Sequence, residues 1–395
     1  MDNQPHRTTP TPEQLAQHAG ARRTFLKRSI GYGALLAAGL QGGGLLARAE
    51  RAAFGAEARG LKILILGGTG FLGPHIVEAA LARGHTLTLF HRGRTNPDIF
   101  PGVEKLIGNR DGDLAALEGD REWDVVIDTS AYYPRVVRDS AGLLRDRVRQ
   151  YVFISSVSVY ADNRNPGADE TAPVGTIDDP DIETVTGSTF GPLKALCEQA
   201  AERAMPGRVT NIRPGLIVGP RDGTDRFTYW PVRVARGGEV LAPNSPDDPI
   251  QFIDVRDLGD WIVNVAERNT TGVFNALGPN GGTTIGKLLQ SCKDVSGSDA
   301  RFVWADAAFL TEQGVAPWSQ MTVWIPPVGG SAGFSRRSNA RAVAAGLTFR
   351  TVDDTVRATL AWFNEQPAER RENLRAGLDA DLEAQVLEAW RERNT

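Results

Sequence analysis

The sequence predicts an α/β fold in which a doubly wound parallel sheet is followed by a smaller C-terminal domain. Three observations predict this fold. Short apolar runs alternate with amphipathic stretches, as in parallel sheets covered by helices. The run 61–66 leads through closely spaced glycines into a helical stretch. From Arg221 onward, charged and aromatic residues replace this alternation.

The segment 61–73 combines a strand, a glycine-rich turn and a helix start. Leu61–Leu66 is apolar except for Lys62, which is typical of a central strand buried on both faces. Pro74 to Arg83 has the spacing of a helix. Glycines let backbone amides approach phosphates, and a helix N-terminus favours negative charge. We therefore expect a Rossmann-type dinucleotide site formed by Gly67, Thr69, Gly70, Phe71, Leu72 and Gly73.

The first 49 residues have the features of a twin-arginine export signal. Arg22 and Arg23 precede a mild apolar stretch, Ile30–Leu46, and a small-residue cleavage site, Ala47–Ala49. The many glycines of this stretch would make a weak spanning helix, so we expect no stable membrane anchor. The segment predicts recognition by the twin-arginine translocation machinery and a periplasmic location. A disordered basic tail is the alternative.

The chain without this signal is acidic. Residues 1–49 hold six basic and two acidic residues, so removing them from 44 basic and 48 acidic residues leaves 38 and 46, a net charge of −8. Such a chain is a poor match for nucleic acid. Two cysteines, Cys197 and Cys292, are too few for a disulfide framework or a metal site, so we expect buried thiols and no metal.

Four further apolar runs predict the next strands, which are Thr86–Phe90, Val103–Ile107, Trp123–Asp128 and Tyr151–Ile154. Helices are expected over Pro134–Asp146 and from Phe190 to Ala204. Ligands of such sheets bind beyond the carboxyl ends of the strands. We therefore expect cofactor contacts from residues that follow these strands: Arg92, Arg94, Asn109, Arg110 and Ser130.

The tip of the second strand indicates which cofactor is bound. In NAD-preferring sites an acidic residue at about this position holds the ribose hydroxyls. His91 stands here instead, and Arg92 and Arg94 follow it. Because these arginines suit a 2′-phosphate, NADP is favoured over NAD. A solvated basic turn is the alternative.

A polar and acidic loop, Asp162–Ser188, separates the fifth strand from the next helix. It is too long to be a plain connector. Two interpretations stand equally: a flap over the crevice, or a disordered surface loop.

Five segments then follow the pattern of one known family. They are Gly67-x-x-Gly70-x-x-Gly73, Ser155-Ser156 with Val159-Tyr160, Phe190 to Lys194, Arg213 to Pro220, and Phe252 to Leu258. With them the chain resembles the extended short-chain dehydrogenase/reductase family, also called the NAD-dependent epimerase/dehydratase family, over about residues 61–365. The resemblance implies a nucleotide-binding domain over 60–212 and a substrate-binding part over 213–366 that is interleaved with the Rossmann sheet.

The resemblance also implies a catalytic set. The family uses a serine, a tyrosine that moves the proton, and a lysine that binds the nicotinamide ribose and favours the phenolate. The serine position here is Ser156, the lysine position is Lys194, and the tyrosine position is Phe190. Three interpretations remain open: another phenol acts as the acid, the protein is non-catalytic, or Phe190 is a substitution in a lineage whose relatives keep tyrosine. The phenolic candidates are Tyr132, Tyr133, Tyr160 and Tyr229.

Dehydration of the family's sugar-nucleotide type is not expected, because Val157 and Ser158 replace the Asp-Glu pair that follows the serine in those enzymes. Reduction, oxidation and epimerisation remain. An aromatic surface beside hydrogen-bonding groups suits a sugar-like or other hydroxylated small molecule. The residues expected to contact the substrate are Tyr132, Asp225, Arg226, Tyr229 and Trp230.

Residues 367–395 form a charged amphipathic stretch that begins at Pro367, a suitable helix start. We expect this helical tail to dock on the body of the protein or on a second copy of the chain. The first functional hypothesis is an exported NAD(P)-dependent oxidoreductase or epimerase. The second is a non-catalytic nucleotide-binding or scaffold protein, because Phe190 has no proton to give. RNA binding, known for plastid relatives, is a third and is disfavoured by the net negative charge.

Overall fold

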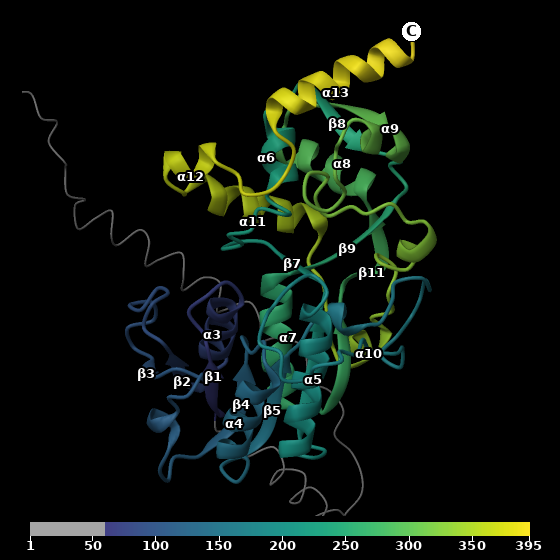
Figure 1. Cartoon of the computed structure of the whole chain (residues 1–395). Helices are drawn as coiled ribbons and strands as arrows, with labels where there is room; N and C mark the ends of the chain where they lie inside the picture. Colours follow the sequence, from purple (N-terminus) through teal and green to yellow (C-terminus); the bar gives the residue numbers. More distant parts are fainter. Residues whose placement is uncertain (1–59) are drawn as a thin grey trace, which may run out of the picture. The chain divides into compact units, whose positions relative to one another are not determined.

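The computed structural model describes residues 60–395 and contains a seven-stranded sheet (Figure 1). The strand order is β10-β6-β5-β4-β1-β2-β3, and every neighbouring pair is parallel. The strands are β1 (Lys62–Leu66), β2 (Thr86–His91), β3 (Glu104–Ile107), β4 (Trp123–Asp128), β5 (Val148–Ile154), β6 (Val209–Pro214) and β10 (Gly272–Ala276). The predicted fold class is confirmed. The predicted signal, 1–49, lies outside the described residues.

The large sheet is buried on both faces. Ile63 and Ile65 pack with α3 (Leu72–Ala82) and α7 (Val255–Glu267) on one face. Leu64 and Leu66 pack with α4 (Pro134–Leu144) and α5 (Phe190–Ala204) on the other. Because successive side chains of a strand point to opposite faces, a strand covered on both sides needs an unbroken apolar run. The apolar run that begins this fold is therefore explained by its position in the centre of the sheet.

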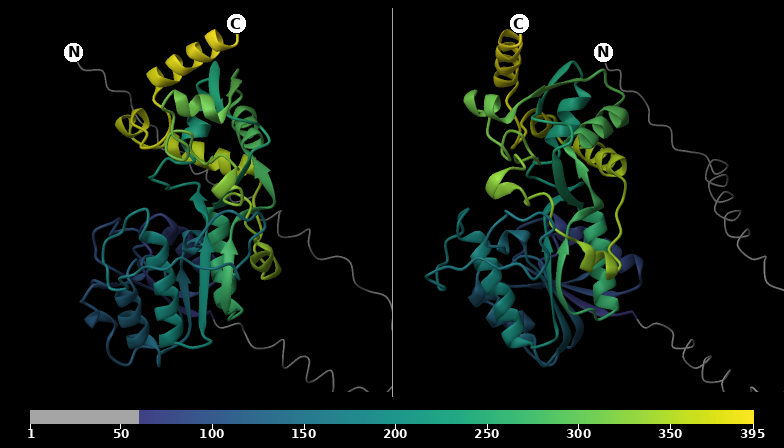
Figure 2. Two further views of the ribbon diagram at one scale, coloured as in Figure 1. Left: turned by 45° about the vertical axis from the view of Figure 1, so that its right-hand side comes forward. Right: turned by 90° about the vertical axis from the view of Figure 1, so that its right-hand side faces the viewer.

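The C-terminal part holds two small sheets, β11-β9-β7 and β12-β8, among helices (Figure 2). Its strands are β7 (Leu216–Val218), β8 (Glu239–Pro243), β9 (Pro249–Asp254), β11 (Gly278–Thr284) and β12 (Arg301–Ala305). Its helices are α6 (Tyr229–Ala235), α8 (Ile285–Ser296), α9 (Ala307–Glu312), α11 (Val352–Asn364), α12 (Ala368–Glu372) and α13 (Ala380–Arg393), whereas α10 (Ala340–Ala344) lies beside β10 of the large sheet. Three short 3₁₀ helices complete the described chain: η1 (Ala115–Leu117), η2 (Val157–Val159) and η3 (Gly329–Ser331).

Three elements from the second half of the sequence belong to the large sheet: β10, α7 and α10, which packs against β10. β10 pairs in parallel with β6, with Phe274 opposite Ile212. α7 packs beside α3 and covers the same face. The nucleotide-binding half is therefore completed by residues that come after the first strand of the C-terminal part.

The tail consists of two helices rather than one. α12 and α13 are separated by Asn373–Asp379, and Asp379 caps α13 by accepting bonds from the Asp381 and Leu382 amides. Val386 and Leu387 are buried in the core of the C-terminal part of the same chain. Contact with a second copy stays a prediction. Within residues 60–395 no helix is both long enough and apolar enough to cross a membrane.

The long acidic loop before α5 is held by bonds to distant segments. The Gly167 amide donates to the Arg336 carbonyl, and the Gly333 amide donates to the Asn163 carbonyl. Farther along the loop, Glu183 forms an ion pair with Arg135 on α4 at 2.8 Å. No residue of the loop lines the cavity described below, so the structure gives no support to the flap interpretation.

Candidate active site

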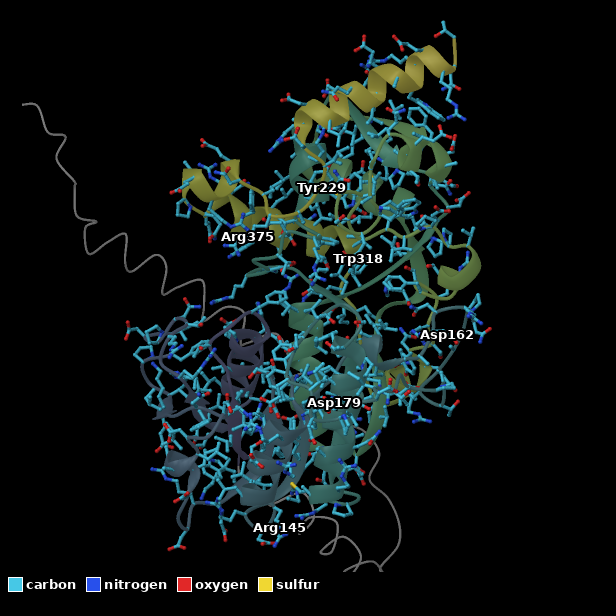
Figure 3. The ribbon with its side chains drawn as sticks, viewed as in Figure 1. Arg145, Asp162, Asp179, Tyr229, Trp318 and Arg375 are labelled. Atoms are coloured by element: carbon cyan, nitrogen blue, oxygen red, sulfur yellow. The ribbon has the colours of Figure 1, made fainter. Side chains whose placement is uncertain are left out.

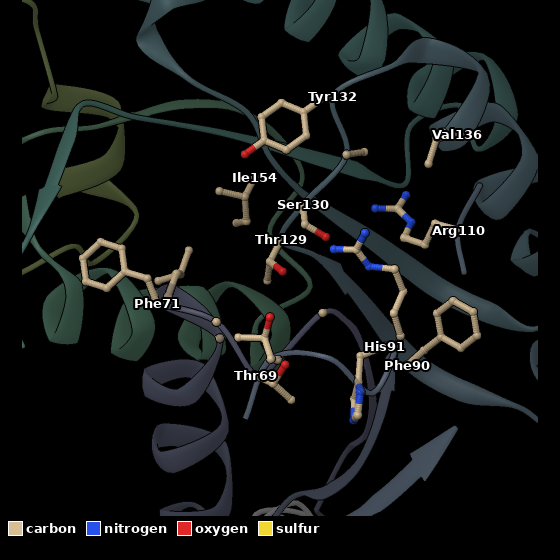
Figure 4. Close-up of a pocket in the computed structure, with 18 of the residues that line it drawn as sticks. Thr69, Phe71, Phe90, His91, Arg110, Thr129, Ser130, Tyr132, Val136 and Ile154 are labelled. Atoms are coloured by element: carbon tan, nitrogen blue, oxygen red, sulfur yellow. The ribbon is translucent and has the colours of Figure 1, made fainter. Parts of the chain in front are cut away.

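A cavity of about 770 Å³ lies at the carboxyl ends of β1, β2, β4 and β5 (Figure 4). The sheet winds in opposite directions from β1 and β4, and open α/β sheets bind ligands where this reversal occurs. The walls include the glycine turn Gly67–Gly73, the residues His91, Arg92 and Arg94 after β2, Gly108–Asp111 after β3, Thr129–Tyr133 after β4, Ile154 and Ser155 at the end of β5, and Phe190 and Lys194 on α5.

The glycine turn forms one wall and has the geometry of a phosphate cradle. Gly67 and Gly68 have φ angles of +115° and +91°, which side-chain-bearing residues rarely adopt. A Cβ atom on Gly73 would lie 2.5 Å from the Gly68 backbone, whereas one on Gly70 would meet no atom within 4 Å. The first turn of α3 has neither a side-chain cap nor an acidic residue, so its amides are available to an anion. These residues fit a dinucleotide pyrophosphate.

The tip of β2 carries two cations without a counter-ion. Arg92 and Arg94 line the cavity, are exposed, and form no ion pair within residues 60–395. His91 is buried, and its Nδ1 atom accepts a hydrogen bond from the Gly93 amide at 3.0 Å. Burial lowers the pKa of His91, which keeps the imidazole neutral near pH 7. The positive charge at this tip therefore comes from the two arginines.

Arg110, which we expected to contact the cofactor, is instead bound to a buried carboxylate. Its guanidinium forms an ion pair with Asp128 and donates to the Ser140 hydroxyl at 3.0 Å. Asp128 also accepts from the Tyr151 hydroxyl at 2.7 Å. A buried cation and anion must pair when water is excluded. The sequence could not show this pairing, and Arg110 borders the cavity with its charge already neutralised.

Asn109 and Ser130 both border the cavity. Asn109 forms an isolated bridge with Asp113, and its side-chain oxygen accepts a bond from the Asp111 amide at 3.3 Å. Ser130 is exposed, and its amide donates to Asp128 at 3.2 Å. Their proposed cofactor contacts stay predictions.

Lys194 lies on the floor of the cavity and is 4% exposed. Its Nζ atom donates to the carbonyl oxygens of Ala131 at 2.9 Å and Ile154 at 2.7 Å. An ammonium group has three N–H donors, so one remains for a ligand. Burial lowers the pKa of this ammonium to about 8. The structure thus places the Lys194 ammonium, with a pKa of about 8, at the carboxyl ends of β4 and β5.

Phe190 stands one turn before Lys194 on α5 and also lines the cavity. Its ring faces Tyr132, and the two ring centroids are 6.1 Å apart. Lys194 Nζ lies 5.5 Å from the centroid of the Tyr132 ring. Tyr132 was expected to contact the substrate, and it does line the cavity.

The two serines after β5 take different positions. Ser155 lines the cavity, is 5% exposed, and its hydroxyl has no hydrogen-bond partner within residues 60–395. Ser156, the serine expected at the site, caps η2: its hydroxyl bonds the Ser158 amide and hydroxyl, both at 3.1 Å. Ser156 is not among the lining residues. The catalytic role of Ser156 stays a prediction, and of the two serines expected at this strand end only Ser155 lines the cavity.

Four other residues expected at the substrate site lie in the C-terminal part and do not line the cavity. Figure 3 labels one of them, Tyr229, among the helices of that part. Asp225 is fully buried and pairs with Arg370 at 2.6 Å. Trp230 is fully buried and donates to the Thr322 carbonyl, and Tyr229 is 3% exposed in the same core. Only Arg226 is partly exposed, with its guanidinium 5.9 Å from the Trp318 ring centroid. We correct the expectation for Asp225, Tyr229 and Trp230, because they have no free surface for a substrate.

No cluster of three or more metal-ligating side chains occurs within residues 60–395. Cys197 and Cys292 are buried, unpaired thiols.

The chain belongs to the NAD dependent epimerase/dehydratase family, whose model matches residues 63–143 and 135–276. Among curated proteins it is similar to the chloroplast stem-loop binding protein of 41 kDa b of Arabidopsis thaliana, with 28% identity over 259 residues. That match covers 60% of this chain and 63% of the plant protein, less than two thirds of its length.

Two solved structures illustrate the likeness in fold. The Bordetella bronchiseptica enzyme WbmH in complex with NAD+ has a TM-score of 0.57 at 17% identity, covering 77% of this chain and 98% of its own. The human epimerase family protein SDR39U1 with NADPH has a TM-score of 0.52 at 20% identity, covering 76% and 99%. The fold and the family are therefore those implied by the sequence motifs.

Proposed function

We propose that this chain is an NADP-dependent oxidoreductase or epimerase of the extended short-chain type, acting on a hydroxylated or sugar-like small molecule. The observation that carries the proposal is Lys194, a nearly buried ammonium with one spare donor at the floor of a crevice whose glycine wall fits a dinucleotide. A bound nicotinamide would exchange a hydride with a carbonyl or alcohol carbon. Lys194 would hold the ribose beside the reacting atoms and stabilise an oxyanion formed there.

The preference for NADP rests on Arg92 and Arg94. Both guanidinium groups line the cavity and lack a carboxylate partner within the described chain. A 2′-phosphate would give the two guanidinium groups an anionic partner. The charge-assisted hydrogen bonds between them would be worth about 1.5–3 kcal/mol each. NAD lacks this phosphate and gains nothing from them.

The first experiment identifies and measures the nucleotide. The folded protein is purified, and one portion is denatured so that any released nucleotide can be identified by mass. A second portion is freed of nucleotide while still folded, and its affinities for NADP and NAD are measured by fluorescence. Arg92→Ala with Arg94→Ala should weaken NADP binding at least about 10-fold and leave NAD unchanged. Arg138→Ala, an exposed arginine of α4, is the matched control. Equal loss of NAD and NADP would contradict the preference.

The alternative is a nucleotide-binding protein without catalysis, which Phe190 favours because it replaces the phenol of the family. A protein that binds NADPH but oxidises it with no carbonyl compound would support this alternative. A protein that binds neither nucleotide would refute both. Nucleic-acid binding remains disfavoured by the net charge of −8 outside residues 1–49.

We also propose export through the twin-arginine pathway, which rests on Arg22-Arg23 and the apolar stretch after them. This pathway carries proteins that are already folded, so a cofactor bound before export would leave the cytoplasm together with the protein. A reporter fused after residue 58 should appear outside the cytoplasm, and Arg22→Lys with Arg23→Lys should retain it inside. Cytoplasmic retention of the unaltered fusion would contradict the proposal.

A further inference from the structure

The proposed reaction needs a proton donor, and the phenylalanine at position 190 cannot supply one. Five tyrosines lie in the described part of the chain. Tyr151 is fully buried and donates to Asp128. Tyr160 donates to Asn275 at 2.7 Å. Tyr229 is enclosed in the core of the C-terminal part. These three phenols are occupied or buried away from the cavity.

The other two tyrosines follow β4 and border the cavity. Tyr133 precedes α4, and its ring packs against the core between α4 and the sheet. Tyr132 is 49% exposed, and Figure 4 shows its hydroxyl on the side of the ring turned toward Ile154, another residue of the cavity wall. Of the phenols of residues 60–395, Tyr132 is thus the one that combines exposure with a hydroxyl directed into the crevice.

Contacts on both sides tie Tyr132 to the catalytic positions of the family. Its ring lies 6.1 Å from that of Phe190, centroid to centroid, so it neighbours the place from which a phenol is missing. Lys194 Nζ lies 5.5 Å from its ring centroid and binds the carbonyl of Ala131, the preceding residue. The lysine therefore fixes the segment that carries Tyr132 and places a cation beside its ring.

We propose that Tyr132 is the proton donor and acceptor of this protein, replacing the phenol that is absent at position 190. The inference rests on the proposed function. In the reducing direction, the carbonyl carbon would receive the hydride that a nicotinamide supplies when it is held at this site, and the carbonyl π electrons would move to the oxygen. The O–H bond of Tyr132 breaks as a new O–H bond forms on the carbonyl oxygen, and the phenolate takes a proton from water. Oxidation of an alcohol runs through the same bonds in reverse.

The position of Tyr132 also explains how Phe190 is tolerated. An aromatic ring at position 190 keeps the packing against Tyr132, while the hydroxyl comes from the neighbouring strand end rather than from α5. The spare N–H of Lys194 can stabilise the negative charge that develops on either oxygen. The class of substrate that fits this arrangement is a small aldehyde, ketone or secondary alcohol whose oxygen reaches the Tyr132 hydroxyl.

The first test measures turnover and binding separately. NADPH oxidation is followed with 9,10-phenanthrenequinone, glyceraldehyde and acetoin, and NADPH affinity is followed by fluorescence. Tyr132→Phe should lower turnover about 10²–10⁴-fold without weakening NADPH binding more than a few-fold. Adding Phe190→Tyr to this variant should restore activity, because it returns the phenol to α5. Tyr229→Phe, which removes a phenol that lies outside the cavity and has no hydrogen-bond partner within residues 60–395, is the matched control.

The second test needs no turnover. N-acetylimidazole acetylates accessible phenols, and the modified residue is located by peptide mass mapping. Tyr132 should be acetylated in the empty protein, and saturating NADP+ should slow this acetylation at least about 10-fold relative to the same reaction without nucleotide.

The outcomes separate the two proposals. Absence of NADPH binding in the unaltered protein refutes the proposed function itself. Binding and turnover that survive Tyr132→Phe overturn only the role of Tyr132. Binding without turnover of any probe, or acetylation of Tyr132 that NADP+ does not slow, also overturns that role.

Discussion

Replacing Lys194 by methionine should remove a pH dependence of stability that the buried ammonium creates. The ordinary pKa of lysine is 10.5, and burial lowers that of Lys194 to about 8. Between these values the unfolded chain keeps a proton that the folded chain has released. Because stability rises with pH wherever the unfolded state binds more protons, the free energy of unfolding of the cofactor-free protein should increase from pH 8 to pH 10.5.

The magnitude follows from the two pKa values. One pH unit corresponds to about 1.4 kcal/mol for a single group, so the gain over the window is about 3 kcal/mol. Lys194 is 4% exposed, which leaves little room for solvent screening. Methionine has a similar length and no proton to lose, so this gain should be absent from Lys194→Met.

The assay is urea unfolding, followed by circular dichroism, at several pH values between 7 and 11. The difference in unfolding free energy, unaltered protein minus Lys194→Met, should rise by about 3 kcal/mol across the window. Lys287→Met, an exposed lysine of α8, should follow the unaltered protein. A difference that stays constant with pH would refute the argument that burial disfavours the charged form of Lys194.

Two further predictions concern the turn and the C-terminal core. Gly73→Ala should abolish NADP binding, because its Cβ would lie 2.5 Å from the Gly68 backbone, whereas Gly142→Ala on α4 has open space and should stabilise by about 0.5–1 kcal/mol. Isothermal calorimetry and urea unfolding measure these effects, and normal binding by the first variant would contradict the close packing. Asp225→Asn should cost about 3 kcal/mol of stability by leaving Arg370 without its anion, yet NADP affinity should not change. Weakened NADP binding without loss of stability would contradict the conclusion that Asp225 lies outside the binding site.

The strands were predictable because a strand that is buried on both faces consists of an unbroken run of apolar residues. The strand Trp123–Asp128 is observed with the predicted ends. The strand predicted over Tyr151–Ile154 ends where predicted but begins three residues earlier, at Val148. The helix after the glycines begins at Leu72 rather than Pro74, because Gly73 packs on the turn as part of the helix. Local patterns of this kind depend on neighbours in the sequence.

The remaining site residues depend on partners far along the chain. Asp225 looked like a substrate contact, but its partner Arg370 comes 145 residues later. Ser155 and Ser156 show a second limit of prediction from sequence. Consecutive residues at a strand end point to opposite sides, so Ser155 lines the cavity while its neighbour Ser156 caps η2. Tyr132 was foreseen at the cavity, whereas its proximity to Phe190 and Lys194 required the fold.

The return of β10 and α7 to the large sheet has a consequence for the history of this chain. A fragment that ends with β6 at Pro214 would leave this strand as an open edge and uncover the sheet face on which α7 lies. Unpaired edges and bare apolar faces invite aggregation. The two halves therefore cannot be exchanged between relatives like separate modules.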